Sequence, residues 1–133
     1  MKLKFLARYR DEGLLLMRLG LGAMFLVHGW PKVIGGPEKW TQIGQAIGYL
    51  GIDFFPLGWG FMAALSEFGG GLCLILGWFF RPACLLLTAT MTVAASMHLG
   101  KGEGLLRASH AIELGIVFFS LLLIGPGRYS ADK

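Results

Sequence analysis

Four long runs of mainly apolar residues alternate with short polar or glycine-rich breaks along this chain of 133 residues. An α-helix rises about 1.5 Å per residue, so about 20 apolar residues are enough to cross the hydrocarbon core of a membrane. Each run comes close to that length. The pattern therefore predicts four membrane-spanning helices, at about residues 13–34, 57–80, 82–99 and 105–125.

Glycine, proline and charged residues mark the breaks between the runs. The breaks are Gly35-Gly36-Pro37, Arg81-Pro82, Gly100-Lys101-Gly102 and Gly125-Pro126-Gly127. Pro82 suits the first turn of the third helix, where its missing N–H group does no harm. Pro31 lies inside the first run and predicts a kink or an early end of that helix.

The segment between the first two runs has a different pattern. Trp40, Ile43, Ile47 and Leu50 recur at helical spacing, with polar residues between them. This pattern predicts a short helix that lies at the membrane surface. The fold expected is thus an all-α integral membrane four-helix bundle, with a short interfacial helix between its first and second spanning helices.

Composition agrees with a membrane protein of one domain, residues 1–133. The chain is 55% hydrophobic and 15% charged, with a mean hydropathy of +0.63, whereas a soluble domain carries about 25% charged residues. The net charge is +4, but the basic residues flank the apolar runs and form no patch, so we expect no nucleic-acid partner. Cys73 and Cys84 lie within apolar runs, where we expect two buried thiols and no disulfide.

Lysine and arginine favour one membrane orientation. Seven lie at the N-terminus, in the second loop and in the C-terminal tail, against four on the other side. Because loops rich in Lys and Arg stay in the cytoplasm, both termini are predicted to be cytoplasmic.

Seven ionisable side chains lie within or at the edges of the apolar runs. They are Arg18, His28, Lys32, Glu67, His98, His110 and Glu113. Such groups are costly in lipid, so they usually face the interior of a bundle or a wet cavity. They are therefore the candidates for a functional site.

Depth and helical face suggest that most of these groups meet. In the predicted orientation all except Arg18 lie in the outer half of the membrane. Arg18, His28 and Lys32 share one stripe of the first helix, and Glu67 shares a face of the second with several small residues. His110 and Glu113 are three residues apart on the fourth helix. We expect a central polar cluster that opens toward the outer face.

Several chemistries fit such a cluster. Histidines and carboxylates bind zinc or iron, but only His110 and Glu113 form a local pair, so no metal site is predicted. A quinone is apolar and has two carbonyl groups that need hydrogen-bond donors, and a histidine and a carboxylate could exchange protons with it. The groups could instead fix the packing of the bundle. Transport of a small solute is a third alternative, although the two halves of the chain show no repeat.

The sequence resembles one known family. The runs LLLMRLGLGAMFLVHGWPKVIG, LSEFGGGLCLILGWFFRPACLLL, MHLGKGEG and LIGPGRYS are similar to those of the DoxX family of small bacterial membrane proteins. This resemblance implies a four-helix bundle in the bacterial cytoplasmic (inner) membrane. It also implies a link to redox chemistry, because relatives include subunits of a thiosulfate:quinone oxidoreductase and members linked to thiol redox and oxidative-stress defence. The matching site positions are Arg18, His28, Lys32, Glu67, His98 and Glu113; His110 is added from helix geometry.

We therefore predict a subunit or accessory of a quinone-linked redox system that acts on small sulfur or thiol compounds. Its partners would be the lipid bilayer, a quinone as the one cofactor suggested, and a partner oxidoreductase subunit or a second copy of the chain. Whether the chain is itself an enzyme stays open, and the alternative is a non-enzymatic subunit that docks a partner. The residues predicted to be catalytic are Glu67, His28, His110 and Glu113, and those predicted to bind substrate are Arg18, Lys32 and His98.

Overall fold

A computed structural model describes residues 2–132 of the chain, and all of its regular structure is helical. The elements are the 3-10 helices η1 (Lys4–Tyr9) and η2 (Gln45–Leu50) and the α-helices α1 (Arg10–Ile34), α2 (Gly36–Gly44), α3 (Pro56–Leu76), α4 (Phe80–Gly100) and α5 (Leu105–Ile124). Four helical segments are long and apolar enough to cross a membrane: Lys4–Ile34, Pro56–Leu76, Phe80–Gly100 and Leu105–Ile124. The predicted all-α fold with four such helices is confirmed.

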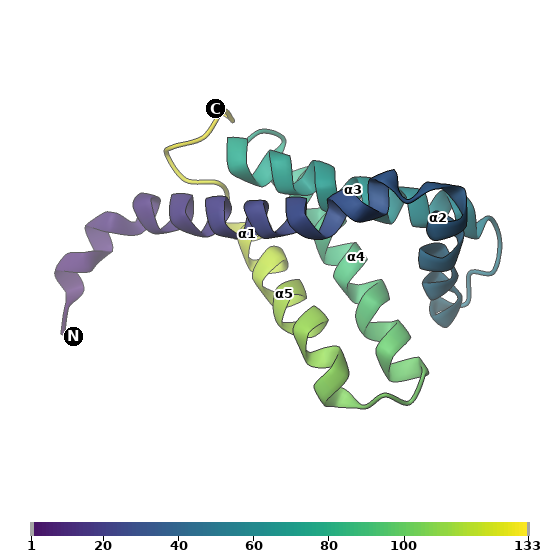
Figure 1. Ribbon diagram of the computed structural model, residues 1–133. Coiled ribbons are helices and arrows are strands. Elements are labelled where there is room, and N and C mark those ends of the chain that lie inside the picture. The colour runs from purple at the N-terminus through teal and green to yellow at the C-terminus, as the bar shows by residue number, and fades with distance from the viewer. Residues whose placement is uncertain (1, 133) are drawn as a thin grey trace.

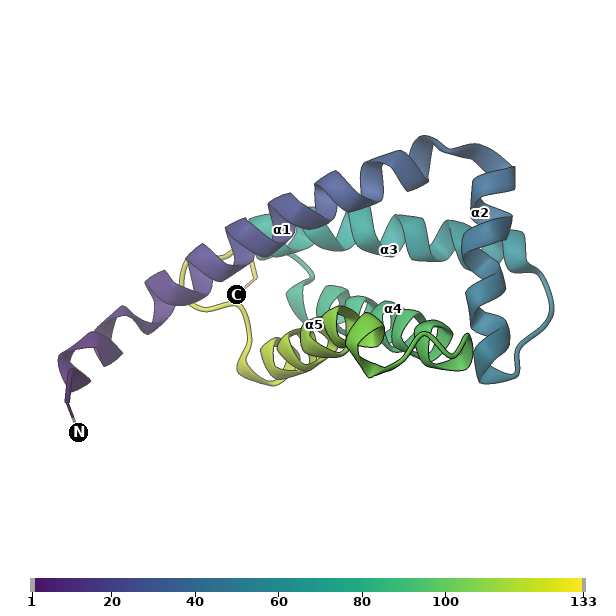
Figure 2. The same cartoon turned by 60° about the horizontal axis from the view of Figure 1, so that its bottom comes forward.

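Helix α3 is the centre of the fold. It packs against α1, α2 and α4, while α4 pairs with α5 as a hairpin. Figures 1 and 2 show α1 and α3 as one layer, the α4–α5 hairpin as a second layer that slants away from it, and the α2–η2 segment across one end. The two layers meet at a buried core in which the Phe25 ring of α1 lies edge-on to the Phe118 ring of α5, with centroids 5.2 Å apart. Cys73 and Cys84 are free thiols.

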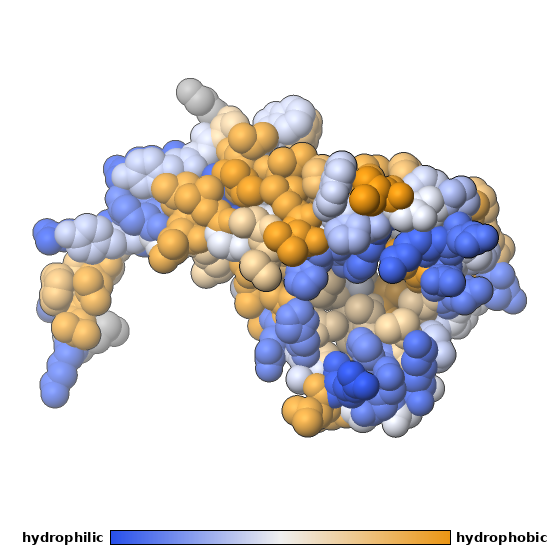
Figure 3. Space-filling model, in the orientation of Figure 1, coloured by the Kyte–Doolittle hydropathy of each residue, from blue (hydrophilic) through white to orange (hydrophobic). Residues whose placement is uncertain are grey.

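The surface is that expected for a protein embedded in lipid. Figure 3 shows large hydrophobic areas over α1, whereas hydrophilic side chains gather over α2 and over the loop end of the α4–α5 hairpin. Large apolar side chains such as Leu16, Val27 and Leu123 are more than half exposed. Because lipid tails solvate such side chains, this exposure costs little in a membrane.

Glycines allow α2 and α3 to cross with their backbones in contact. A Cβ atom on Gly44 would lie 1.6 Å from the carbonyl oxygen of Pro56, and one on Gly60 would lie 1.5 Å from that of Trp40. Any side chain at these two positions would push the helices apart, and small residues are the usual means of such close packing in membranes. The crossing places α2 and η2 beside α3 and α4, where they close one side of a cavity.

We expect Gly60→Ala to lower the midpoint of thermal unfolding in detergent, because the added methyl group overlaps the backbone of α2. Overpacking of this kind costs about 1–3 kcal/mol. Gly69→Ala is the matched control, since Gly69 lies in the same helix and a Cβ there meets nothing within 4 Å. Equal stability of the two variants would show that the crossing tolerates a wider spacing.

The corner between the second and third spans differs from the prediction. Helix α3 ends at Leu76, not near residue 80, and α4 begins at Phe80. Gly77 ends α3 in the left-handed conformation, at φ +66°, which favours glycine. The carboxylate of Asp132 then accepts hydrogen bonds from the backbone N–H groups of Phe79 and Phe80, at 3.0 and 2.8 Å. The distant C-terminal segment thus caps the start of α4, which no local pattern reveals.

The end of the first span also runs further than an early end at Pro31 would allow, since α1 continues to Ile34. A short helix, α2, follows it as predicted. The indole N–H of Trp40 on α2 donates to the carbonyl oxygen of Lys32 at 2.8 Å and ties α2 to the last turn of α1. The position of α2 at the membrane surface stays a prediction.

Candidate functional site

A cavity of about 370 Å³ lies between α3, α4 and the α2–η2 segment. Most of its wall is apolar and comes from side chains such as Ile47, Ala63, Leu86 and Val93. Its lining residues with polar side-chain atoms are few: Lys32, Gln42, Trp59, Ser66, Glu67 and Thr90. A mainly apolar cavity with a few polar groups is the usual form of a small-molecule site.

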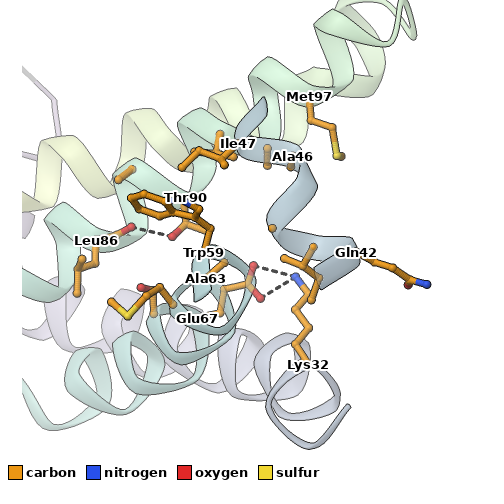
Figure 4. A pocket seen from close by; sticks show the side chains of 17 residues that line it. Lys32, Gln42, Ala46, Ile47, Trp59, Ala63, Glu67, Leu86, Thr90 and Met97 are labelled. Carbon is orange, nitrogen blue, oxygen red and sulfur yellow. Dashed lines mark hydrogen bonds and ion pairs between the residues drawn. The ribbon is translucent and has the colours of Figure 1, made fainter. Parts of the chain in front are cut away.

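An ion pair forms part of the cavity wall. Lys32 Nζ, in the last turn of α1, donates to both carboxylate oxygens of Glu67 on α3, at 2.9 and 2.7 Å. The Glu67 side chain is only 7% exposed and that of Lys32 33%. Figure 4 shows the ammonium group beside the carboxylate, with a dashed line to each of its oxygens. Since an ammonium group has three N–H donors, one remains for another acceptor.

Trp59 carries a buried donor with no acceptor. It lies eight residues before Glu67, two turns along the same face of α3, and its indole N–H is buried without a hydrogen-bond partner among the described residues. Almost all buried N–H groups in proteins are paired, because an unpaired one costs about 1–3 kcal/mol. Figure 4 shows the indole at the centre of the cavity, beside Thr90. Its hydrogen-bonding capacity is thus unused, and a ligand in the cavity would reach this N–H by a small turn of the indole, because the nitrogen itself is closed to solvent.

The sequence pattern did not predict that Trp59 belongs to the site. A tryptophan near the start of a spanning helix fits the aromatic belt of a membrane surface. The sequence does contain one signal for it: Trp59 and Glu67 are eight residues apart, a spacing that puts both side chains on about the same side of a helix.

Arg18 has a different environment from that predicted. It is 1% exposed and does not line the cavity. Its Nε and Nη2 donate to the carbonyl oxygens of Leu74 and Ile75 at the end of α3, at 2.9 and 3.1 Å. Its Nη1 donates to those of Pro126 and Tyr129, at 3.1 and 2.6 Å. Four of the five guanidinium N–H groups are therefore used to join α1, α3 and the C-terminal segment, which leaves little for a substrate.

His98 lies at the end of α4 and pairs with the α4–α5 loop. Its Nδ1 is 2.7 Å from Oε1 of Glu103. This hydrogen bond is the main reason that the pKa of Glu103 is lowered from its ordinary value. His98 does not line the cavity, although its neighbour Met97 does.

His28, His110 and Glu113 are exposed and lie outside the cavity. None of them makes a side-chain hydrogen bond or an ion pair with another described residue. The structure thus brings together two of the seven candidates, Lys32 and Glu67, and the expected central cluster does not form. Within residues 2–132, no group of three His, Cys, Asp or Glu side chains is placed to hold a metal ion.

Comparisons with known proteins agree with the resemblance seen in the sequence. The DoxX family model matches residues 13–100. The chain is similar to the inner membrane protein YqjF of Escherichia coli strain K12, with 29% identity over 95% of this chain and 94% of that protein. It is also similar to an uncharacterized protein of Haemophilus influenzae, with 30% identity over 96% of this chain and 94% of that one. No solved structure matches the chain.

Proposed function

This chain belongs to the DoxX family and is a multi-pass bacterial membrane protein, and from that premise we propose that its cavity binds the headgroup of a quinone. In this proposal the protein is a subunit or accessory of a redox system that oxidises small sulfur or thiol compounds. Of the residues predicted from the sequence, the proposal keeps Glu67 as the proton-carrying group and Lys32 as the substrate-binding group.

The observation that carries the proposal is the unpaired indole N–H of Trp59 in a mainly apolar cavity that also holds Lys32 and Glu67. A quinone ring is flat and apolar, and its two carbonyl oxygens are hydrogen-bond acceptors at opposite edges. Trp59 would donate to one of them, and the third N–H of Lys32 is a donor for the other. The cavity volume lies in the range of about 300–1,000 Å³ that is usual for small-ligand sites.

The ion pair suits the proton chemistry of such a ligand. A quinone that takes up two electrons also takes up two protons to become a quinol. Oxidation of two thiols to a disulfide, by a partner subunit, would release two electrons and two protons and so balance the reaction. Glu67, whose carboxylate touches the cavity and is held by Lys32, would take up one proton at a time from water and pass it to the reduced ring.

We expect Trp59→Phe to weaken the binding of a short-chain ubiquinone to the purified protein by about tenfold, the effect of one lost hydrogen bond. Calorimetry in detergent measures the affinity. Trp78→Phe is the matched control, because Trp78 is 52% exposed and lies outside the cavity. An analogue of the same shape without carbonyl groups should bind both variants equally. If ubiquinone does not bind the unaltered protein, or binds both variants equally, the proposal is wrong.

A second function has its own observation. Both Glu67 oxygens are bonded to Lys32, so the pair could serve only to hold α1 against α3 in a non-enzymatic subunit. The two functions make different predictions for variants in which both residues are replaced.

A further inference from the structure

One face of α5 carries a regular stripe that the fold leaves uncovered. Its members recur at alternating intervals of four and three residues: Leu106, His110, Glu113, Val117, Ser120 and Ile124. All are exposed except Val117, which is half-buried. We call these six residues the α5 stripe. Figure 3 shows hydrophilic side chains over the loop-proximal half of this hairpin, below the apolar surface of α1.

The depth of Glu113 makes this exposure costly. Glu113 is the ninth of the twenty residues of α5, about 12 Å along the helix from its start, and so lies near the middle of the span. Ionisable groups at that depth are rarely left facing lipid, because they pair with other groups inside a bundle or a cavity. His110, one turn closer to the surface, is also exposed. A polar partner for both side chains is therefore expected from outside this chain.

A groove next to the α5 stripe shows how polar side chains are usually satisfied in lipid. Thr88 and Thr92 line this groove between α4 and α5, and Ser120 of the stripe lies at its edge. Each donates its hydroxyl hydrogen to a carbonyl oxygen one turn earlier, that of Cys84 at 2.7 Å and that of Thr88 at 2.9 Å. These groups are satisfied within their own helix and need no partner, in contrast to His110 and Glu113.

We infer that two copies of this chain pair through the α5 stripe, about a two-fold axis along the membrane normal. Both copies have the same topology, so their α5 helices run parallel. Alternating intervals of four and three residues form the seam of a parallel helix pair, and left-handed pairing of this type is the commoner form in membranes. A two-fold interface uses the same surface on both copies.

Charge complementarity selects a second copy as the occupant. The stripe contains both a hydrogen-bond donor and an acceptor, three residues apart. In a parallel pair, His110 of each copy comes next to Glu113 of the other, which gives two identical pairs and leaves neither side chain facing lipid. The cavity stays free in such a dimer, because no residue of α5 lines it. The inference is therefore independent of the proposed quinone site.

Cysteine cross-linking in native membranes tests the pairing. In the full chain with Cys73→Ala and Cys84→Ala, Ser120→Cys should form a covalent homodimer on mild oxidation. Phe119→Cys should stay monomeric. The two positions are adjacent and equally deep, but Ser120 belongs to the stripe whereas Phe119 faces away from it. Equal cross-linking at both positions, or a Ser120→Cys product that contains a different protein, would overturn the inference.

A second measurement does not depend on introduced cysteines. The unaltered chain should be dimeric by native mass spectrometry in a lipid-like detergent, and Glu113→Leu should weaken self-association about tenfold, the size expected for lost polar contacts between membrane helices. Leucine suits a lipid-facing helix, so this variant should fold. A monomeric unaltered chain, or unchanged self-association of the variant, contradicts the pairing.

Discussion

Replacement of Arg18 by leucine is expected to cause the largest loss of stability of any single change in this protein. The guanidinium group is buried and donates to four backbone carbonyl oxygens, two at the end of α3 and two in the C-terminal segment. Its loss leaves these acceptors without their donor and separates the segment from α3. We expect the free energy of unfolding to fall by about 3–5 kcal/mol, near 1 kcal/mol for each of the four hydrogen bonds lost.

Two further variants separate geometry from charge. Arg18→Lys keeps the charge but has one donor atom in place of a planar fork, so it should recover less than half of the loss. Arg107→Leu removes an exposed arginine and should change stability by less than about 0.5 kcal/mol. Thermal unfolding in detergent gives the ranking, and limited proteolysis should cleave the segment at residues 126–132 faster in Arg18→Leu. A leucine variant as stable as the unaltered chain would show that water satisfies the four carbonyls equally well.

Replacing both members of the Lys32–Glu67 pair should separate stability from ligand binding. Lys32→Met alone leaves a nearly buried carboxylate without its ion-pair partner, and we expect a loss of about 1–3 kcal/mol, less than for a fully buried pair because Lys32 is one-third exposed. The double variant Lys32→Met/Glu67→Met contains no unpaired charge. It should regain most of the lost stability, as apolar replacements of buried pairs often do.

The same double variant distinguishes the two functions. If the pair binds a quinone, the stable double variant should have lost most of its affinity for ubiquinone. If the pair only fixes packing, affinity should be unchanged. The pair of His98 and Glu103, in which both side chains are about one-third exposed, provides the control cycle, and its coupling should stay below about 1 kcal/mol. A double variant less stable than either single variant would show that the loss in the single variants does not come from an unpaired buried charge.

The helices could be predicted from the sequence because the membrane imposes their length and apolar character locally. Turn residues then marked most of the ends. The corner at Gly77 to Phe79 was misplaced, since it depends on Asp132, more than fifty residues away. The role of Arg18 was hidden for a related reason, because its partners are backbone carbonyls, which every residue type carries.

The candidate site could be predicted only in part. Lys32 and Glu67 were recognised as costly groups in apolar runs, and they do pair. The prediction placed His110 and Glu113 beside them because it assumed four upright helices around one axis, in which residues at the same depth in the membrane lie close together. The α4–α5 hairpin instead slants away from the layer of α1 and α3 (Figure 1). Trp59 escaped notice because an unpaired N–H becomes visible only when all of its neighbours are placed.

The hydrogen bonds made by residues 126–132 also constrain the order in which the structure forms during synthesis. A ribosome completes this segment only after all four spanning helices have been made. Until then the guanidinium of Arg18 lacks two of its acceptors, and the N–H groups of Phe79 and Phe80 lack the Asp132 carboxylate. Arrival of this segment completes the corner between α3 and α4, so a segment made after all four spanning helices closes the structure around the first of them.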